Sequence, residues 1–217
     1  MRTALVIGAT GLIGKQLVDL LLSDPDLDKV KVFARKEIPS HTIKQIFIKT
    51  AFDSLDGIKN EITGTDLFIC MGTTIKVAGS QAQFHKVDHD YPLNFAKLAR
   101  ENGVVNVYLV SSIGANSKSR NFYLRTKGEL EEHLAALNFN KTIIFQPSML
   151  LGKRKEKRLG EKVGQIVMTK LNFLLFGPLS IYRAVDSLKV AKAMQAWTLK
   201  DYKGLRVISS FEILNNF

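Results

Sequence analysis

Short apolar runs alternate with stretches of helical periodicity over the first two thirds of the chain. Residues 3–7 (TALVI) form an apolar run that stops at a glycine, as a buried parallel strand does. Residues 12–22 carry apolar positions at helical spacing and end at Ser-Asp-Pro. Further strands are predicted over residues 30–34, 43–48, 66–71, 104–110 and 142–145, and further helices over residues 90–102 and 122–137. This alternation predicts an α/β fold with a doubly wound parallel sheet.

After residue 150 the pattern changes. A charged segment (residues 153–158) precedes a mostly apolar stretch (residues 163–179), an amphipathic stretch (residues 186–197) and a last edge strand (residues 205–209). We expect residues 150–217 to form a small substrate-side lobe on the same sheet, within a single domain of residues 1–217. The apolar stretch suits a pocket wall, a face for a homodimer or protein partner, or a membrane-surface helix. The charged segment suits a solvated loop over an anionic cofactor, and no nucleic-acid partner is expected because no aromatic residues interleave with it.

Composition narrows the class of protein. The chain has 217 residues, enough for one domain with a substantial core. Its net charge of +11 attracts anions without choosing among them. No uninterrupted apolar run is long enough to span a membrane, and the first residues lack the apolar core of a signal peptide. These observations predict a cytoplasmic protein without a transmembrane segment.

The cysteine and the histidines suggest no metal or thiol chemistry. Cys70 is the single cysteine and ends a predicted strand, where a buried small apolar side chain is expected rather than a nucleophile. The histidines are scattered and show no metal-ligand spacing, so no metal site is predicted. They are His41, His85, His89 and His133.

Three glycines lie between the first strand and the first helix. They are Gly8, Gly11 and Gly14 of the sequence GATGLIG. A tight strand-to-helix turn needs a residue without Cβ, and a pyrophosphate must approach the backbone at the positive end of the helix. The setting predicts a dinucleotide site, although a tight turn without a ligand has the same pattern.

Two basic residues follow the second predicted strand. Arg35 lies 21 residues after Gly14, with Lys36 beside it. NAD sites usually have an acidic residue at about this distance, on the ribose hydroxyl. A guanidinium there suits a 2′-phosphate and therefore favours NADP(H) over NAD(H), the alternative being a solvated basic turn.

A serine pair, a tyrosine and a lysine suggest carbonyl reduction. Ser111 and Ser112 close the strand over residues 104–110, and Tyr123 and Lys127 share one face of the next helix. Carbonyl reduction needs a proton donor at the oxygen while hydride reaches the carbon, and a nearby ammonium makes a phenol a stronger acid. Tyr123 is the expected acid and Lys127 its electrostatic partner; a helix cap and a solvated lysine are the alternative.

These motifs together resemble the short-chain dehydrogenase/reductase superfamily, in its atypical or extended branch. Within that branch, segments spread from about residue 4 to about residue 200 are similar to the Tat-interacting-protein-like oxidoreductases: CMGTT (70–74), VDHDY (87–91), SSIGA (111–115), YLRTKGE (123–129) and FQP (145–147). The resemblance implies a Rossmann-type fold. It is specific for fold and cofactor and uninformative about the substrate.

The resemblance also assigns roles to positions. It implies that the cofactor phosphates lie on Thr10, Gly11, Leu12 and Ile13, and the 2′-phosphate on Arg35 and Lys36. It implies an adenosine and ribose path along Met71 and Gly72, and contacts of Leu150 with the nicotinamide and of Arg158 with cofactor or substrate. Lys127 would also hold the ribose, and Ser111 fits the usual serine-x-x-glycine spacing better than Ser112. Gln146 and Ser148 depart from the family, which often has arginine and glycine there.

Two functions follow from this pattern. The first is an NADP(H)-dependent oxidoreductase that reduces a small carbonyl compound through the Ser/Tyr/Lys site. The alternative is an NADP(H)-binding regulatory or scaffold protein with little or no turnover, since this fold serves both purposes. The presence of the full Ser/Tyr/Lys set favours the enzyme.

Overall fold

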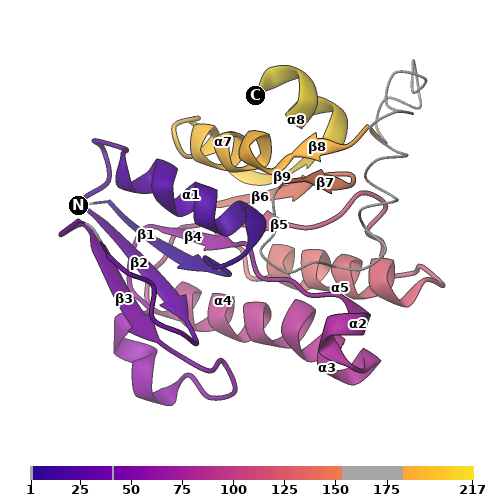
Figure 1. Ribbon diagram of the computed structural model, residues 1–217, viewed down its shortest axis with the longest axis horizontal. Helices are drawn as coiled ribbons and strands as arrows, with labels where there is room; N and C mark the ends of the chain where they lie inside the picture. Colours follow the sequence, from indigo (N-terminus) through magenta and orange to yellow (C-terminus); the bar gives the residue numbers. More distant parts are fainter. Residues whose placement is uncertain (1, 41, 153–182) are drawn as a thin grey trace.

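A parallel sheet forms the centre of the molecule in the computed structural model, which describes residues 2–40, 42–152 and 183–217. Within these residues the main sheet has seven strands, all paired in parallel (Figure 1). In spatial order they are β3 (Gln45–Lys49), β2 (Lys29–Ala34), β1 (Thr3–Ile7), β4 (Asp66–Ile69), β5 (Asn106–Val110), β6 (Lys141–Gln146) and β9 (Gly204–Ser209). The predicted doubly wound fold is confirmed.

Helices cover both faces of this sheet (Figure 1). One face carries α1 (Leu12–Leu22), α7 (Ser187–Thr198) and α8 (Ser210–Asn216). The other carries α4 (Tyr91–Glu101) and α5 (Phe122–Ala136). Short segments complete the described chain: the 3-10 turn η1 (Asp56–Glu61), the helices α2 (Ile75–Ala78) and α3 (Gln81–His85), the π-turn η2 (Lys86–Asp90), and a two-stranded ladder of β7 (Leu150–Leu151) with β8 (Val185–Asp186).

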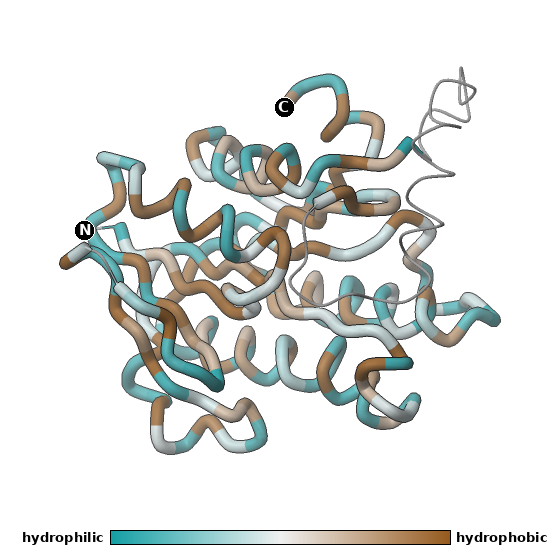
Figure 2. Tube along the Cα trace, in the orientation of Figure 1, coloured by the Kyte–Doolittle hydropathy of each residue, from teal (hydrophilic) through white to brown (hydrophobic). Residues whose placement is uncertain are grey.

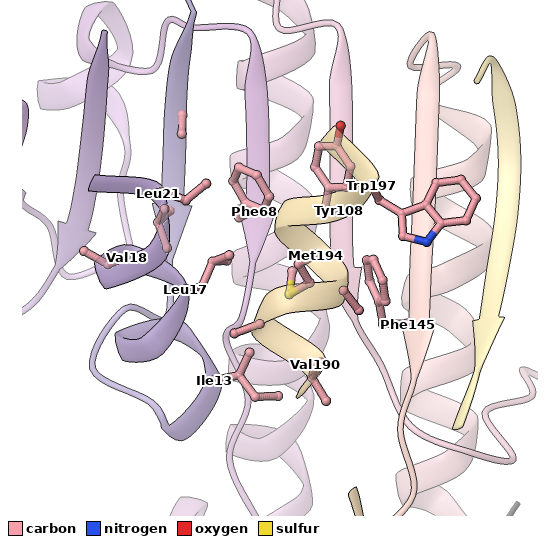
Figure 3. Close-up of a cluster of buried hydrophobic side chains, with 14 of the residues drawn as sticks. Ile13, Leu17, Val18, Leu21, Phe68, Tyr108, Phe145, Val190, Met194 and Trp197 are labelled. Atoms are coloured by element: carbon pink, nitrogen blue, oxygen red, sulfur yellow. The ribbon is translucent and has the colours of Figure 1, made fainter. Parts of the chain in front are cut away.

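Alternation along the strands divides the core into two layers. In β1, Ala4 and Val6 pack under α1 and α7, whereas Leu5 and Ile7 pack on the α4 and α5 side. Both faces of the central strands are therefore apolar, which explains their continuous hydropathy in Figure 2. Figure 3 shows the first layer, with Leu17 of α1 and Met194 of α7 directed at the sheet.

The described part of the C-terminal segment is integrated into this core. Strand β9 pairs with β6, and α7 packs beside α1 on the same face of the sheet. The amphipathic stretch and the edge strand predicted there are present. The charged segment, the apolar stretch and Arg158 lie outside the described residues, so the predicted substrate-side lobe stays a prediction. Among the described helices, none is long and apolar enough to cross a membrane.

Candidate functional site

The strand order reverses between β1 and β4, and this is where the sequence motifs converge. Ile7 at the end of β1 is in register with Phe33 of β2 and with Ile69 of β4. The residues that follow these strands, Gly8, Arg35 and Met71 among them, are consequently brought to one edge of the sheet. Open parallel sheets bind their ligands at such a switch point, outside the carboxyl ends of the strands.

Gly8 and Gly14 are required by close backbone packing. Gly8 has a φ of +81°, and a Cβ there would lie 2.4 Å from the backbone of Cys70 and Met71. A Cβ on Gly14 would lie 2.3 Å from the Gly8 carbonyl oxygen. No side chain larger than hydrogen fits at either position, so these glycines set the approach of α1 to β1 and β4.

Gly11 leaves the start of α1 open. It is the N-cap of α1, its N–H donates to the Gly8 carbonyl at 3.0 Å, and no side chain caps the helix. Thr10 and Gly11 are exposed, and no acidic residue lies in the first turn, which begins with Leu12 and Ile13. An uncapped helix N-terminus carries partial positive charge and unpaired N–H groups, as the phosphates of a dinucleotide require.

Arg35 and Lys36 are exposed just beyond the end of β2. The pKa of the Asp53 carboxyl is lowered, chiefly by a hydrogen bond from Lys86. The positive charge of Arg35 contributes a smaller part of this shift. The two cations are thus available at the edge where the 2′-phosphate of a bound NADP(H) is expected.

Tyr123 and Lys127 occupy successive turns at the start of α5. The helix is capped by Asn121, whose side chain accepts from the Leu124 N–H. Tyr123 is half-buried, with its ring centroid 5.6 Å from that of Phe84. Lys127 is almost fully buried. The predicted helix face is therefore present, but its lysine is not a solvated surface residue.

A buried carboxylate that was not predicted as a site residue holds Lys127. The Lys127 Nζ lies 2.8 Å from Oδ1 of Asp88, and the other oxygen of Asp88 accepts from the Thr73 N–H at 2.8 Å. Burial alone would lower the pKa of the Lys127 ammonium, but Asp88 and, to a smaller extent, Tyr123 outweigh it, and the pKa is raised. Lys127 is therefore held as a cation inside the protein.

Gly72 completes this contact. A Cβ on Gly72 would lie 3.3 Å from Asp88 Oδ1 and 3.5 Å from Lys127 Nζ. The sequence assigned Gly72 only to the adenosine path, whereas the structure places it against the Asp88–Lys127 ion pair. The absence of a side chain there leaves room beside the ion pair, at the end of β4.

The two serines have different surroundings. Ser111 is buried and its hydroxyl donates to Glu131 of α5, which also accepts two hydrogen bonds of 3.0 Å from Gln146. Ser112 is half-buried, and its hydroxyl has a long contact of 3.4 Å to the Ile113 carbonyl. Gln146, which departs from the resembled family, thus has a structural partner in Glu131. Burial raises the pKa of the Glu131 carboxyl, although the hydrogen bonds from Ser111 and Gln146 oppose this.

Two further glycines bring the remaining segments to the site. A Cβ on Gly128 would lie 2.2 Å from the backbone N of Ser117, so α5 packs directly against the loop after the serines. Leu150 lies in β7, and a Cβ on Gly152 would lie 2.6 Å from the Leu12 side chain. The segment after β6 therefore reaches the start of α1, as the expected nicotinamide contact of Leu150 requires.

Three histidines that are separated in the sequence gather beside this site. His85 and His89 both lie close to Asp90, and the Nε2 of His89 lies 2.8 Å from the Nδ1 of His133. Burial lowers the pKa of His89, partly offset by Asp90. No metal site was predicted from the spacing of these residues, yet the fold brings their side chains together.

Comparison with known proteins identifies the family. A family described as NAD(P)H-binding matches residues 8–171 of the chain. This protein belongs to the NAD(P)H-binding family. The protein named FMP52, mitochondrial, from Coccidioides immitis is 32% identical over 94% of this chain and 88% of its own length. The protein of the same name from Candida albicans is 37% identical over 75% of this chain and 73% of its own length.

Solved structures agree on the fold. UDP-glucose 4-epimerase from Thermotoga maritima, solved with UDP-glucose, has a TM-score of 0.71 at 16% identity, covering 96% of this chain and 77% of its own. The Bordetella bronchiseptica enzyme WbmH, solved with NAD+, has a TM-score of 0.71 at 14% identity, covering 97% of this chain and 76% of its own. The predicted membership in the short-chain dehydrogenase/reductase superfamily is confirmed by the family match together with this fold.

The predicted cytoplasmic location is wrong. Relatives at 32–37% identity, including one from Saccharomyces cerevisiae, are named mitochondrial proteins. The prediction relied on the lack of a signal-peptide core and of a membrane-spanning run. The lack of these features does not discriminate between the cytosol and an organelle.

Proposed function

We propose that this NAD(P)H-binding protein is an oxidoreductase that prefers NADP(H) and reduces a small carbonyl compound at Tyr123. The observation that carries the proposal is the buried Lys127–Asp88 ion pair, whose lysine is one helical turn from Tyr123. The pair lies at the same edge of the sheet as the glycine turn. Burying a charge pair is costly, so its position beside a tyrosine supports a chemical role.

In the proposed reaction the protein handles the proton. Bound NADPH supplies the hydride. The Tyr123 hydroxyl donates its proton to the substrate carbonyl oxygen, and the cationic Lys127 stabilises the negative charge that develops on the phenol oxygen. Asp88 keeps Lys127 in one position by holding its ammonium, and Lys127 also donates to the ribose hydroxyls of the cofactor.

Ser112 is the better candidate for the substrate oxygen. The Ser111 hydroxyl already donates to Glu131, whereas among the described residues that of Ser112 has only the long contact to its neighbour's carbonyl. We therefore expect Ser112→Ala to lower kcat by about tenfold, the effect of one lost hydrogen bond of ordinary strength. Ser111→Ala is the matched control and should act through stability; a larger kcat loss in Ser111→Ala would return the role to Ser111.

The cofactor preference is tested by fluorescence titration with NADPH and NADH. Arg35→Ala removes a charge-assisted contact to the 2′-phosphate, so NADPH affinity should fall by about tenfold while NADH affinity stays constant. Arg206→Ala, an exposed arginine on β9, is the matched control and should change neither. Equal losses for both nucleotides would contradict the NADP(H) preference. If neither NADPH nor NADH binds, the cofactor site itself is contradicted.

Turnover is tested with a panel of small carbonyl compounds and NADPH. Tyr123→Phe should lower kcat by about 100-fold or more while leaving the dissociation constant of NADPH within about twofold, because general acid catalysis contributes that much to rate. NADPH binding without turnover of any compound would favour the second function, an NADP(H)-binding regulatory or scaffold protein. The mitochondrial names of the relatives support a mitochondrial location for this protein, which subcellular fractionation tests.

A further inference from the structure

The π-turn η2 brings together residues that an α-helix would separate. Its backbone closes with the Tyr91 N–H donating to the Lys86 carbonyl, a spacing of five residues. Residues five apart therefore approach one face, and His85 meets Asp90 there. Because sequence patterns for metal sites assume α-helical or loop spacing, this pairing is hidden in the sequence.

Three potential ligand atoms converge on this face. Oδ1 of Asp90 lies 3.2 Å from Nδ1 of His85 and 2.8 Å from Nδ1 of His89. One ligand atom from each of these three residues fits within 4.8 Å of the others. Ligands bound tetrahedrally to zinc at its usual bond lengths lie about 3.3 Å apart. Small side-chain movements would bring the three atoms to that separation.

The outward nitrogens of both imidazoles also have partners. Nε2 of His85 lies 3.5 Å from Oε2 of Glu129, and Nε2 of His89 lies 2.8 Å from Nδ1 of His133. Histidines that bind metals typically donate their second N–H to a carboxylate or another acceptor, which fixes the tautomer and the ring orientation. Here each histidine has its Nδ1 directed at Asp90 and its Nε2 at a residue of α5.

Of the three side chains, one is nearly buried and two are partly exposed to solvent. The side chain of His89 is 9% exposed, those of His85 and Asp90 are 35% and 45% exposed. Asp90 also lines a surface hollow of about 450 Å³ together with Lys86 and Tyr91. An ion can therefore reach the site from solvent while the inner histidine is held by its surroundings.

We propose that His85, His89 and Asp90 bind a divalent transition-metal ion of the zinc class, with water completing its coordination. Two imidazoles and one carboxylate favour such an ion over Mg²⁺ or Ca²⁺, which prefer oxygen ligands alone. The site is next to Asp88 in the chain, so a bound ion fixes the π-turn that presents Asp88 to Lys127. The proposal does not depend on the reaction at Tyr123.

The test is isothermal titration of the full chain with ZnCl₂ after chelator treatment, alongside MgCl₂. We expect one Zn²⁺ per chain and no saturable Mg²⁺ binding. His85→Gln and His89→Gln should each weaken Zn²⁺ binding by at least about tenfold, and Glu129→Gln by about tenfold through the orientation of His85. His41→Gln, which removes a histidine that the proposal does not use, is the matched control and should leave the affinity unchanged.

Urea denaturation of each variant shows independently whether it is folded. If buried His89→Gln fails to fold, the more exposed His85→Gln still decides the question. Absence of saturable Zn²⁺ binding, or equal weakening by His41→Gln, would overturn the proposal. A protein that binds Zn²⁺ but no NADPH would contradict the proposed function and leave this site in place.

Discussion

The glycine turn and the Asp88–Lys127 ion pair lie at the same edge of the sheet but are built in opposite ways. The turn consists of backbone: Gly8 and Gly14 have no room for a Cβ, and α1 follows at once. The ion pair consists of two charged side chains, buried after being brought together from η2 and α5. The turn is therefore sensitive to volume and the ion pair to charge.

The largest loss of folding stability is expected from a substitution at Gly8, where the turn is crowded. Gly8→Ala combines a positive φ with a clash against backbone that cannot rotate away, so we expect a loss of about 4 kcal/mol in the free energy of unfolding. Gly79 is the matched control because its φ of +84° is similar and, among the described residues beyond its neighbours in the chain, none has an atom within 4 Å of its Cβ position. Gly79→Ala should cost only about 1 kcal/mol. Urea denaturation measures both, and equal losses would show that crowding at Gly8 is unimportant.

A somewhat smaller loss of folding stability is expected when the negative charge of Asp88 is removed. Asp88→Asn keeps the shape of the side chain and leaves Lys127 buried without its counter-charge, which should cost about 3 kcal/mol of unfolding free energy. Glu101→Gln removes one partner of the exposed Lys59–Glu101 pair and should have no measurable effect.

The double variant Asp88→Asn/Lys127→Met sharpens this result. Because it removes the stranded charge, it should recover part of the stability lost in Asp88→Asn. Urea denaturation of the single and double variants in one buffer measures the recovery. Additive losses would mean that the two charges do not interact in the folded protein.

The smallest effect should appear in the pH dependence of stability at Glu131. Its pKa is raised in the folded protein by burial, so the folded state binds the proton more tightly than the unfolded state does. The stability that this tighter proton binding provides is fully present below the pKa of Glu131 in the unfolded state. It is lost as the pH rises through the pKa of Glu131 in the folded state. Glu131→Gln stays neutral, and its stability relative to the wild type should therefore improve as the pH rises from 4 to 8. A relative stability that is constant or falls over this range would contradict the assignment.

Local sequence features predicted the turn well. The apolar run of β1, the glycines and the helical periodicity of α1 are all contained in the first 22 residues, and the predicted helix over residues 12–22 coincides with α1. The helix with Tyr123 and Lys127 was also predicted within one residue of its observed end. In these elements each short-range preference agrees with the fold, so spacing alone indicates the structure.

The partners of the site residues were not predicted, because they come from distant segments. Asp88 was noticed only as part of a family-like segment, and nothing in its neighbourhood indicates that it ends beside Lys127. Glu131 was missed for the same reason, although it takes the hydrogen bond of Ser111. The π-turn adds a further difficulty, because it changes the helical repeat and with it the residues that share a face.

The sequence by itself determined the order of strands and helices along the chain, the glycine turn and the helix face of Tyr123 and Lys127, because periodicity, glycine placement and helical spacing act over a few residues. Only the tertiary structure decided which charges are buried together, which serine hydroxyl is hydrogen-bonded to Glu131 and which histidines lie in contact. Those outcomes depend on how α3, η2 and α5 pack against one another, and the energy of a buried charge is set by neighbours that are far away in the chain.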